Sequence, residues 1–203
     1  AMKEKGLFGE VFTFIDASSL ITKTALWDER DKAIAAGEEK LNNAIVNNYT
    51  ADKQAKWGAK SKTNIWFGYK RHNAVDMKFG LINQVAVTPA NVPDYKAIKY
   101  LAPSQGMVFM DKGYDYEEAD QWIREKGGVP ATLRKNNNKQ KNFDLDRWRS
   151  GVRMPFESTF SKQRKLAKYQ GQLKVTFQCL AEAMVYNLKK AARILPRLAT
   201  AET

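Results

Sequence analysis

Five apolar runs along this chain have the length and composition of β-strands. They cover residues 11–16, 65–75, 81–88, 107–111 and 129–133. The first and the fourth contain almost uninterrupted apolar residues, which is typical of strands buried on both faces of a parallel or mixed sheet. The second and third runs meet at Lys78-Phe79-Gly80, and this junction predicts a hairpin.

Between these runs the sequence predicts helices. Residues 24–48 are rich in Ala, Glu, Lys and Asp and predict a helix or a helical insertion. A short helix is expected from Asp94, which we interpret as its cap. Residues 115–118 have the acidic pattern of a capping box, and the helical spacing of the apolar residues after them ends at the glycine pair 127–128.

The most regular helical pattern lies late in the sequence. Its apolar residues recur at i, i+3, i+4, i+7 and i+8 over several turns, and Pro196 is expected to end the helix. They are Phe177, Leu180, Ala181, Met184, Val185, Leu188, Ala191, Ala192 and Leu195. We expect this stripe to pack on the sheet. Residues 52–62 and 136–142, in contrast, are polar and predict loops.

The resulting order is strand, helical insertion, hairpin, helix, strand, helix, strand and two helices. This order predicts an α/β fold with a mixed five-stranded sheet flanked by helices. A length of 203 residues suits one domain with a substantial core. We therefore expect a single domain over residues 1–203, with the insertion at about 24–50.

The chain is strongly basic, with 34 Lys and Arg against 22 Asp and Glu and a formal net charge of +12. Residues 134–174 hold twelve of these basic residues and only three acids, interleaved with Trp148 and Tyr169. This clustering favours a nucleic-acid partner over a merely solvated surface. No apolar segment approaches the ~18 residues of a membrane span, so no membrane partner is expected.

Cys179 is the only cysteine and His72 the only histidine. No internal disulfide can form, which fits a reducing cytoplasm, and Cys179 is expected to pack within a helix. One Cys and one His cannot build a zinc site. Any metal must therefore be held mainly by oxygen atoms, which favours Mg²⁺ or Mn²⁺.

Three carboxylates are candidates for such a site. Asp16 and Asp111 each follow an apolar strand, where a buried charge is costly unless it is paired or binds a cation. Glu157 lies on a predicted helix that begins at Pro155 and carries a basic row including Arg164. Two divalent ions held by such acids would support in-line chemistry at a phosphodiester. The alternatives are turn caps for the aspartates and a surface Glu–Arg pair for the glutamate.

The segments around these acids carry further motifs. They are Phe14-Ile-Asp-Ala-Ser18, Phe67-Gly-Tyr-Lys-Arg-His72, Val87-Thr-Pro-Ala-Asn-Val-Pro-Asp94, Asp111-Lys-Gly-Tyr114 and Glu157-Ser-Thr-Phe-Ser-Lys-Gln-Arg-Lys165. In this order they resemble bacterial insertion-sequence transposases of the DDE type, in the fourth and fifth insertion-sequence families. The resemblance covers most of the chain.

The resemblance implies an RNase H-like fold with Asp16, Asp111 and Glu157 as a catalytic triad that binds two Mg²⁺ or Mn²⁺ ions. The residues that it implies along the DNA are Lys70, His72, Lys112, Tyr114, Arg164 and Lys165. The basic segment 134–174 adds Arg153, Lys162 and Lys168 as DNA-binding candidates. For His72 and Tyr114, packing or hydrogen bonding is the alternative role. Only a few residues precede the first strand, so we expect the end-binding region of the family to be absent.

The implied activity is that of a DNA transposase catalytic domain. It would cleave a strand at the end of an insertion sequence and transfer the 3′-hydroxyl to target DNA, in the bacterial cytoplasm at the nucleoid. Its expected partners are double-stranded DNA and, on that DNA, a second copy of the chain. The alternatives are an RNase H-like nuclease without strand transfer and an inactive or domesticated DNA-binding module.

Overall fold

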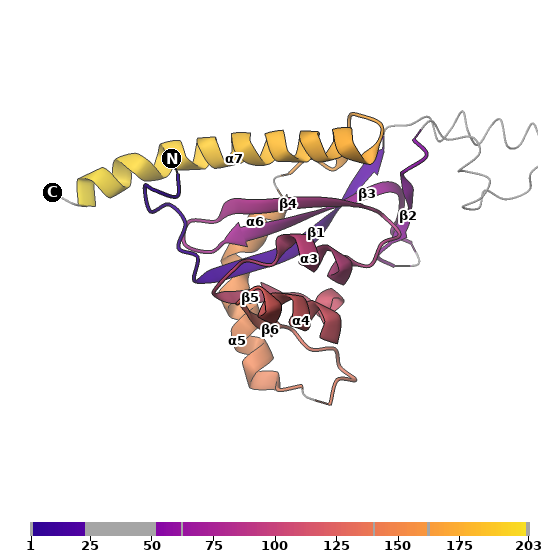
Figure 1. The fold of residues 1–203 in the computed structure, drawn as a ribbon, viewed down its shortest axis with the longest axis horizontal. Coiled ribbons are helices and arrows are strands. Elements are labelled where there is room, and N and C mark those ends of the chain that lie inside the picture. Colours follow the sequence, from indigo (N-terminus) through magenta and orange to yellow (C-terminus); the bar gives the residue numbers. More distant parts are fainter. Residues whose placement is uncertain (1, 23–51, 62, 140, 162, 202–203) are drawn as a thin grey trace, which may run out of the picture.

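A computed structural model describes residues 2–22, 52–61, 63–139, 141–161 and 163–201 of the chain (Figure 1). The expected helical insertion at about 24–50 lies outside these ranges, as does Lys162. The described residues form one mixed sheet flanked by helices. None of the helices in these ranges is both long and apolar enough to cross a membrane.

The central sheet has an antiparallel half and a parallel half that share one strand, β1. Hydrogen bonding gives the order β4-β3-β1-β5-β6, with β4-β3-β1 antiparallel and β1-β5-β6 parallel. The short strand β2 pairs with β3, and the short strand β7 pairs with β1. The strands are β1 (Phe12–Thr22), β2 (Lys56–Ala59), β3 (Ile65–Asp76), β4 (Leu81–Pro89), β5 (Met107–Met110), β6 (Val129–Thr132) and β7 (Leu166–Ala167). This mixed arrangement confirms the predicted α/β class and is consistent with an RNase H-like fold.

Helices cover both faces of this sheet (Figure 1). They are η1 (Asp94–Ala97), α3 (Ile98–Leu101), η2 (Lys112–Tyr114), α4 (Glu117–Glu125), α5 (Phe143–Arg153), η3 (Met154–Phe156), α6 (Glu157–Ser161) and α7 (Gln172–Ala201). The long helix α7 lies along β4, and the amino-terminal segment packs at its far end through Leu7. The sheet is therefore the middle of three layers.

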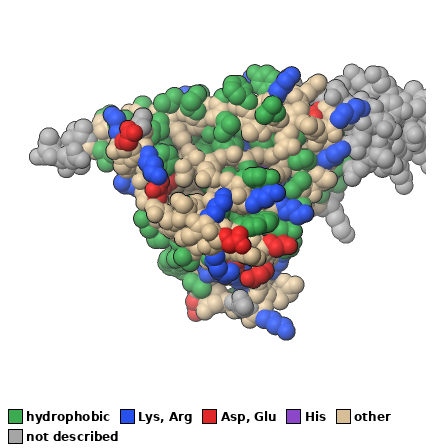
Figure 2. Space-filling view, viewed as in Figure 1, with side chains coloured by type: hydrophobic (Ala, Val, Ile, Leu, Met, Phe, Trp, Pro, Cys, Tyr) green, Lys and Arg blue, Asp and Glu red, His purple; other side chains and the backbone are tan. Residues whose placement is uncertain are grey.

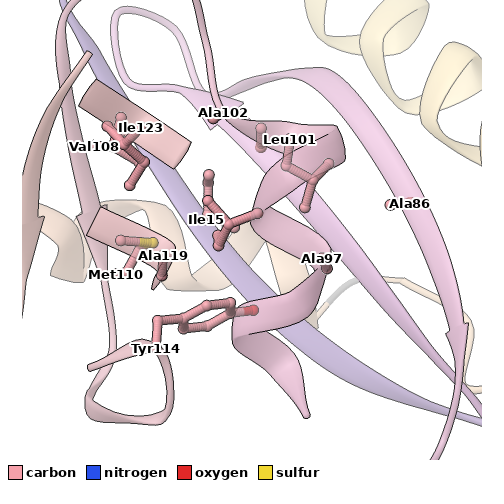
Figure 3. Packing of buried hydrophobic residues seen from close by; sticks show 12 residues of the cluster. Ile15, Ala86, Ala97, Leu101, Ala102, Val108, Met110, Tyr114, Ala119 and Ile123 are labelled. Carbon is pink, nitrogen blue, oxygen red and sulfur yellow. The ribbon is translucent and has the colours of Figure 1, made fainter. Parts of the chain in front are cut away.

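Alternating side chains of β1 supply the cores on both faces, as the two-residue period of a strand requires. Ile15 packs with Met110 and with Ala97 and Leu101 of η1 and α3 (Figure 3). Its neighbour Phe14 packs on the other face, with its ring 5.1 Å from that of Phe160 in α6. Both halves of the fold are thus tied to one strand.

The buried face of α7 differs from the predicted one over most of the helix, although Ala191 of the predicted stripe is buried. Six apolar residues of the helix are exposed, and Figure 2 shows hydrophobic side chains along the upper edge where α7 runs. They are Leu173, Phe177, Leu180, Met184, Val185 and Leu188. The residues that pack on the sheet are instead Val175, Cys179 and Ala183, which confirms the expected packing of Cys179.

Polar residues explain why the pattern indicated the wrong face of α7. Gln178 and Asn187 are buried on the sheet side, where Asn187 Oδ1 accepts from the N–H of Ile82 and its Nδ2 donates to the Ile82 carbonyl. Small and polar side chains allow α7 to approach the sheet closely, but they do not register as an apolar stripe. The helix also continues through Pro196 to Ala201, beyond its predicted end.

Several other boundaries differ from the predictions. The first strand does not end at Asp16, because residues 17–21 continue to pair with β3 as far as Gly68. Residues 52–62, predicted as a loop, contain β2, and α5 was not predicted. The expected capping box is absent from α4, since its N-cap is Tyr116 and makes no side-chain capping bond.

Candidate active site

Asp16 and Asp111 lie on neighbouring strands because of the parallel pairing of β1 and β5. The register runs from Phe12 opposite Met107 to Ile15 opposite Met110, so the two aspartates are the next pair along it. Residues at matching positions of paired parallel strands point to the same face. This face is the one on which α5 and α6 pack, as the Phe14–Phe160 contact shows.

Asp16 is the more buried of the two aspartates. The pKa of its carboxyl is raised from 3.8 to about 6, chiefly by burial and to a smaller extent by the nearby charge of Asp111. The N–H of Ala17, which donates to Asp16 Oδ1 at 2.8 Å, and the charges of Lys60 and Arg153 oppose this shift. A cation at this carboxylate would offset the cost of burying its negative charge.

Arg153, which lies one helical turn before Glu157, is close to the carboxylates of both Glu157 and Asp111. Arg153 Nη2 is 3.7 Å from Asp111 Oδ1 and 3.8 Å from Glu157 Oε1. The Arg153 side chain is only 14% exposed, whereas those of Asp111 and Glu157 are 49% and 54% exposed. One guanidinium group therefore links the acid after β5 to the acid of α6.

The helix that carries Glu157 is shorter than predicted. α6 ends at Ser161, and Arg164 and Lys165 lie in the segment that leads to β7. This segment leaves the helix because the Lys165 carbonyl accepts from the N–H of Ile21 at 2.7 Å and Arg71 Nη2 donates to the Arg164 carbonyl. The predicted basic row beside Glu157 on one helix is therefore wrong.

The three acids offer the donor atoms that a hard divalent cation prefers, since all are carboxylate oxygens. Among the described residues, however, no three Asp, Glu, His or Cys side chains are close enough to hold one metal ion together. Asp16 and Asp111 form a neighbouring pair, and Glu157 is connected to that pair through Arg153. The donor set fits Mg²⁺ or Mn²⁺, provided that Glu157 exchanges its contact with Arg153 for one with the metal.

Two residues expected along the DNA are buried on the opposite face of the sheet. His72 lies within the protein, with its Nε2 2.8 Å from Thr88 Oγ1, and burial lowers the pKa of its imidazole to about 4. Tyr114 is buried among Ile15 and Ala97, and Figure 3 shows its ring pointing into that cluster. Their burial favours the packing and hydrogen-bonding roles over direct contact with DNA.

Lys70 has protein partners on this same face. Its Nζ donates to Asp94 Oδ1 at 2.8 Å and to the Val92 carbonyl at 2.9 Å. Asp94 is the first residue of η1 rather than its cap, because Pro93 is the N-cap. The ion pair therefore fixes the turn after β4 on the sheet.

The remaining basic candidates are exposed. They are Lys112 beside Asp111, and Arg164, Lys165 and Lys168 in the segment between α6 and α7. The polar sequence around 52–62 gave no reason to select Lys60, although its charge acts on Asp16. Arg71 was also missed, and its burial beside Glu182 is a contact that the sequence does not reveal.

Comparisons with known proteins identify the family of this chain. The family described as "Transposase DDE domain" matches residues 8–188. A transposase for insertion sequence element IS1106 from Neisseria meningitidis serogroup B is 31% identical over 212 residues, which cover 98% of this chain and 72% of that protein. No solved structure matches the chain significantly. The family match over most of the chain and the similarity to this transposase show that the chain belongs to the DDE transposase family.

Proposed function

We propose that this chain carries out metal-dependent DNA strand cleavage and 3′-hydroxyl strand transfer at the ends of an insertion sequence. The observation that carries the proposal is the register of β1 and β5, which sets Asp16 beside Asp111 on the face where Glu157 approaches through Arg153. Family membership supports a DNA transposase, and such enzymes generally use divalent ions.

Asp16 and Asp111 would hold two Mg²⁺ or Mn²⁺ ions, with Glu157 as a further ligand. When bound, the ions would activate an oxygen nucleophile and neutralise the charge on the leaving oxygen of the phosphodiester. Asp16 must be ionised to serve as a ligand, and the raised pKa of its carboxyl means that it releases a proton near pH 6. Arg153 would keep the acids neutralised until metal and DNA arrive.

The exposed basic residues would hold the phosphate backbone of double-stranded DNA. They are Lys112, Arg164, Lys165 and Lys168, together with Arg153 and with Lys162, which lies outside the described residues. Each cation that neutralises a phosphate releases counterions, so binding should weaken steeply with salt. A homodimer on the DNA and a location at the bacterial nucleoid complete the proposal.

The test compares the wild type with Asp16→Asn, Asp111→Asn and Glu157→Gln in Mn²⁺ binding and in strand cleavage. Glu125→Gln is the matched control, since Glu125 is an exposed acid at the end of α4. We expect each site variant to lose Mn²⁺ binding measured by calorimetry and to lose at least a hundred-fold in cleavage of a duplex carrying an insertion-sequence end, whereas the control does neither.

Three results would change the proposal. Cleavage that survives all three site variants would remove these acids from the mechanism. Cleavage without joined end–target product would indicate a nuclease. Absence of Mn²⁺ binding by the wild type in the presence of DNA would favour an inactive DNA-binding module.

A further inference from the structure

A groove runs along the outer side of α7, between that helix and the segment that joins α6 to β7. Its volume is about 570 Å³, within the range of ~300–1,000 Å³ typical of ligand sites. Gln163, Arg164, Lys168 and Tyr169 line it from the segment between α6 and α7, and residues of α7 complete the lining. The three candidate acids do not line the groove, and Gln163 and Arg164 of its lining follow α6 closely in the chain.

The floor of the groove is apolar and partly aromatic. Phe177, Ala181 and Val185 present one face of α7 to it, and Phe177 is 69% exposed. Tyr169 also lines the groove and is 51% exposed. Exposed aromatic rings beside cations are the usual platforms on which unpaired bases stack.

The charge that faces the groove is positive. Arg164, Lys168 and Lys189 line it, and the acid in its wall is Glu182. Glu182 Oε2 accepts from Arg71 Nη1 at 2.7 Å, and Arg71 is only 2% exposed, so this negative charge is already paired. Among the residues that the structure describes, the groove therefore presents more positive than negative charge to a phosphate backbone.

Hydrogen bonds hold the two walls of the groove at a fixed spacing. Gln178 of α7 accepts from the N–H of Lys168 at 2.8 Å and donates to the Leu166 carbonyl at 3.0 Å. Tyr186 Oη lies 3.1 Å from Thr159 Oγ1, two residues after Glu157 in α6. The groove is thus preorganised, and it is attached to the helix that carries the candidate glutamate.

We propose that this groove binds an unpaired strand of DNA, with bases on Phe177 and Tyr169 and phosphates on Arg164, Lys168 and Lys189. A DNA duplex hides the faces of its bases, so it could use the cations of the groove but not its apolar floor. Only a single-stranded segment presents bases and phosphates together. The inference rests on the proposed function, in which strand cleavage occurs at the acids that include Glu157 of α6.

The experiment measures fluorescence anisotropy of a blunt duplex and of the same duplex with a single-stranded tail of about six nucleotides, without divalent metal. Wild type should bind the tailed DNA at least ten-fold more tightly. Phe177→Ala should remove about ten-fold of that preference and leave the blunt duplex unchanged. Lys189→Gln should weaken tailed binding and reduce its salt slope by about 0.7.

Matched controls lie on the same helix outside the groove. Leu188→Ala removes another exposed apolar side chain, and Arg193→Gln removes another exposed cation, one outside the basic segment 134–174. Both should bind tailed and blunt DNA as the wild type does. A 2-aminopurine base in the tail should be quenched on binding to the wild type and not to Phe177→Ala, because stacking on the ring causes the quenching.

Equal binding of tailed and blunt DNA by the wild type would overturn the inference. So would a dimer in sedimentation that Phe177→Ala disrupts while tailed binding stays unchanged, since the groove would then belong to a contact between copies. Binding is measured without metal, and for this reason loss of cleavage in the Asp16 or Asp111 variants tests the proposed function separately. Normal cleavage with normal tailed binding by Phe177→Ala would refute the groove alone.

Discussion

Replacing Asp16 by Asn should stabilise the metal-free protein at neutral pH. Burial raises the pKa of the Asp16 carboxyl from 3.8 to about 6, so folding takes up a proton between these values. The contribution of Asp16 to the free energy of unfolding therefore falls as pH rises through this window. The loss is complete above pH about 6. A rise in the pKa from 3.8 to about 6 corresponds to a loss of about 3 kcal/mol in the free energy of unfolding. Solvent screening at the partly exposed carboxylate gives a range of about 1.5–3 kcal/mol.

Urea unfolding at about pH 4 and about pH 7.5 in a chelating buffer measures this effect. The free energy of unfolding of Asp16→Asn, relative to wild type, should increase by about 1.5–3 kcal/mol between the two conditions. Differences taken at each pH cancel the titration of all other groups, and Glu125→Gln should show a change below about 0.5 kcal/mol. An Asp16→Asn difference that stays constant with pH would refute the argument that a buried charge is relieved.

Three further changes test the packing of the fold by urea unfolding. Val175→Ala should lower the free energy of unfolding by about 2 kcal/mol, because Val175 is buried. Leu173, on the same helix, is 84% exposed, so Leu173→Ala should lower it by less than about 0.5 kcal/mol. The reverse order would contradict the assigned face of α7. Arg71→Met should lower the free energy of unfolding by about 2–4 kcal/mol, because the Glu182 carboxylate and the Arg164 carbonyl lose their buried donor. A neutral result would mean that solvent replaces the guanidinium group of Arg71. Gly68→Ala should lower the free energy of unfolding by at least about 2 kcal/mol, since φ of Gly68 is 151° and a Cβ would meet the backbone oxygen of Leu20 in β1. Unchanged stability would show that β3 can shift at this position.

Five of the seven described strands were predictable from the sequence because their apolar runs are bounded by polar residues, whereas the short strands β2 and β7 were not. The neighbouring positions of Asp16 and Asp111 follow from the pairing of two such strands, and the structure places them on one face. Strand pairing itself is not written in a local pattern. It depends on the crossover between the strands, which local propensity does not describe.

The less predictable parts involve polar groups with distant partners. Asn187 and Gln178 put hydrogen-bonding side chains on the buried face of α7, and this reversed the face expected from apolar spacing. The segment after α6 leaves its helix to meet Ile21, more than a hundred residues earlier in the chain. Such contacts exist only in the folded protein.

The parallel pairing of β1 with the four-residue strand β5 limits which changes of chain length the site can survive. An added or deleted residue in residues 103–105, which lie between α3 and β5 outside any helix or strand, leaves β5 free to keep its register. The same change within Met107–Met110 reverses the face of every side chain after it, and Asp111 would then turn toward the core around Ile15. Substitutions in β5 that preserve its apolar character should therefore be far better tolerated than any single-residue insertion there.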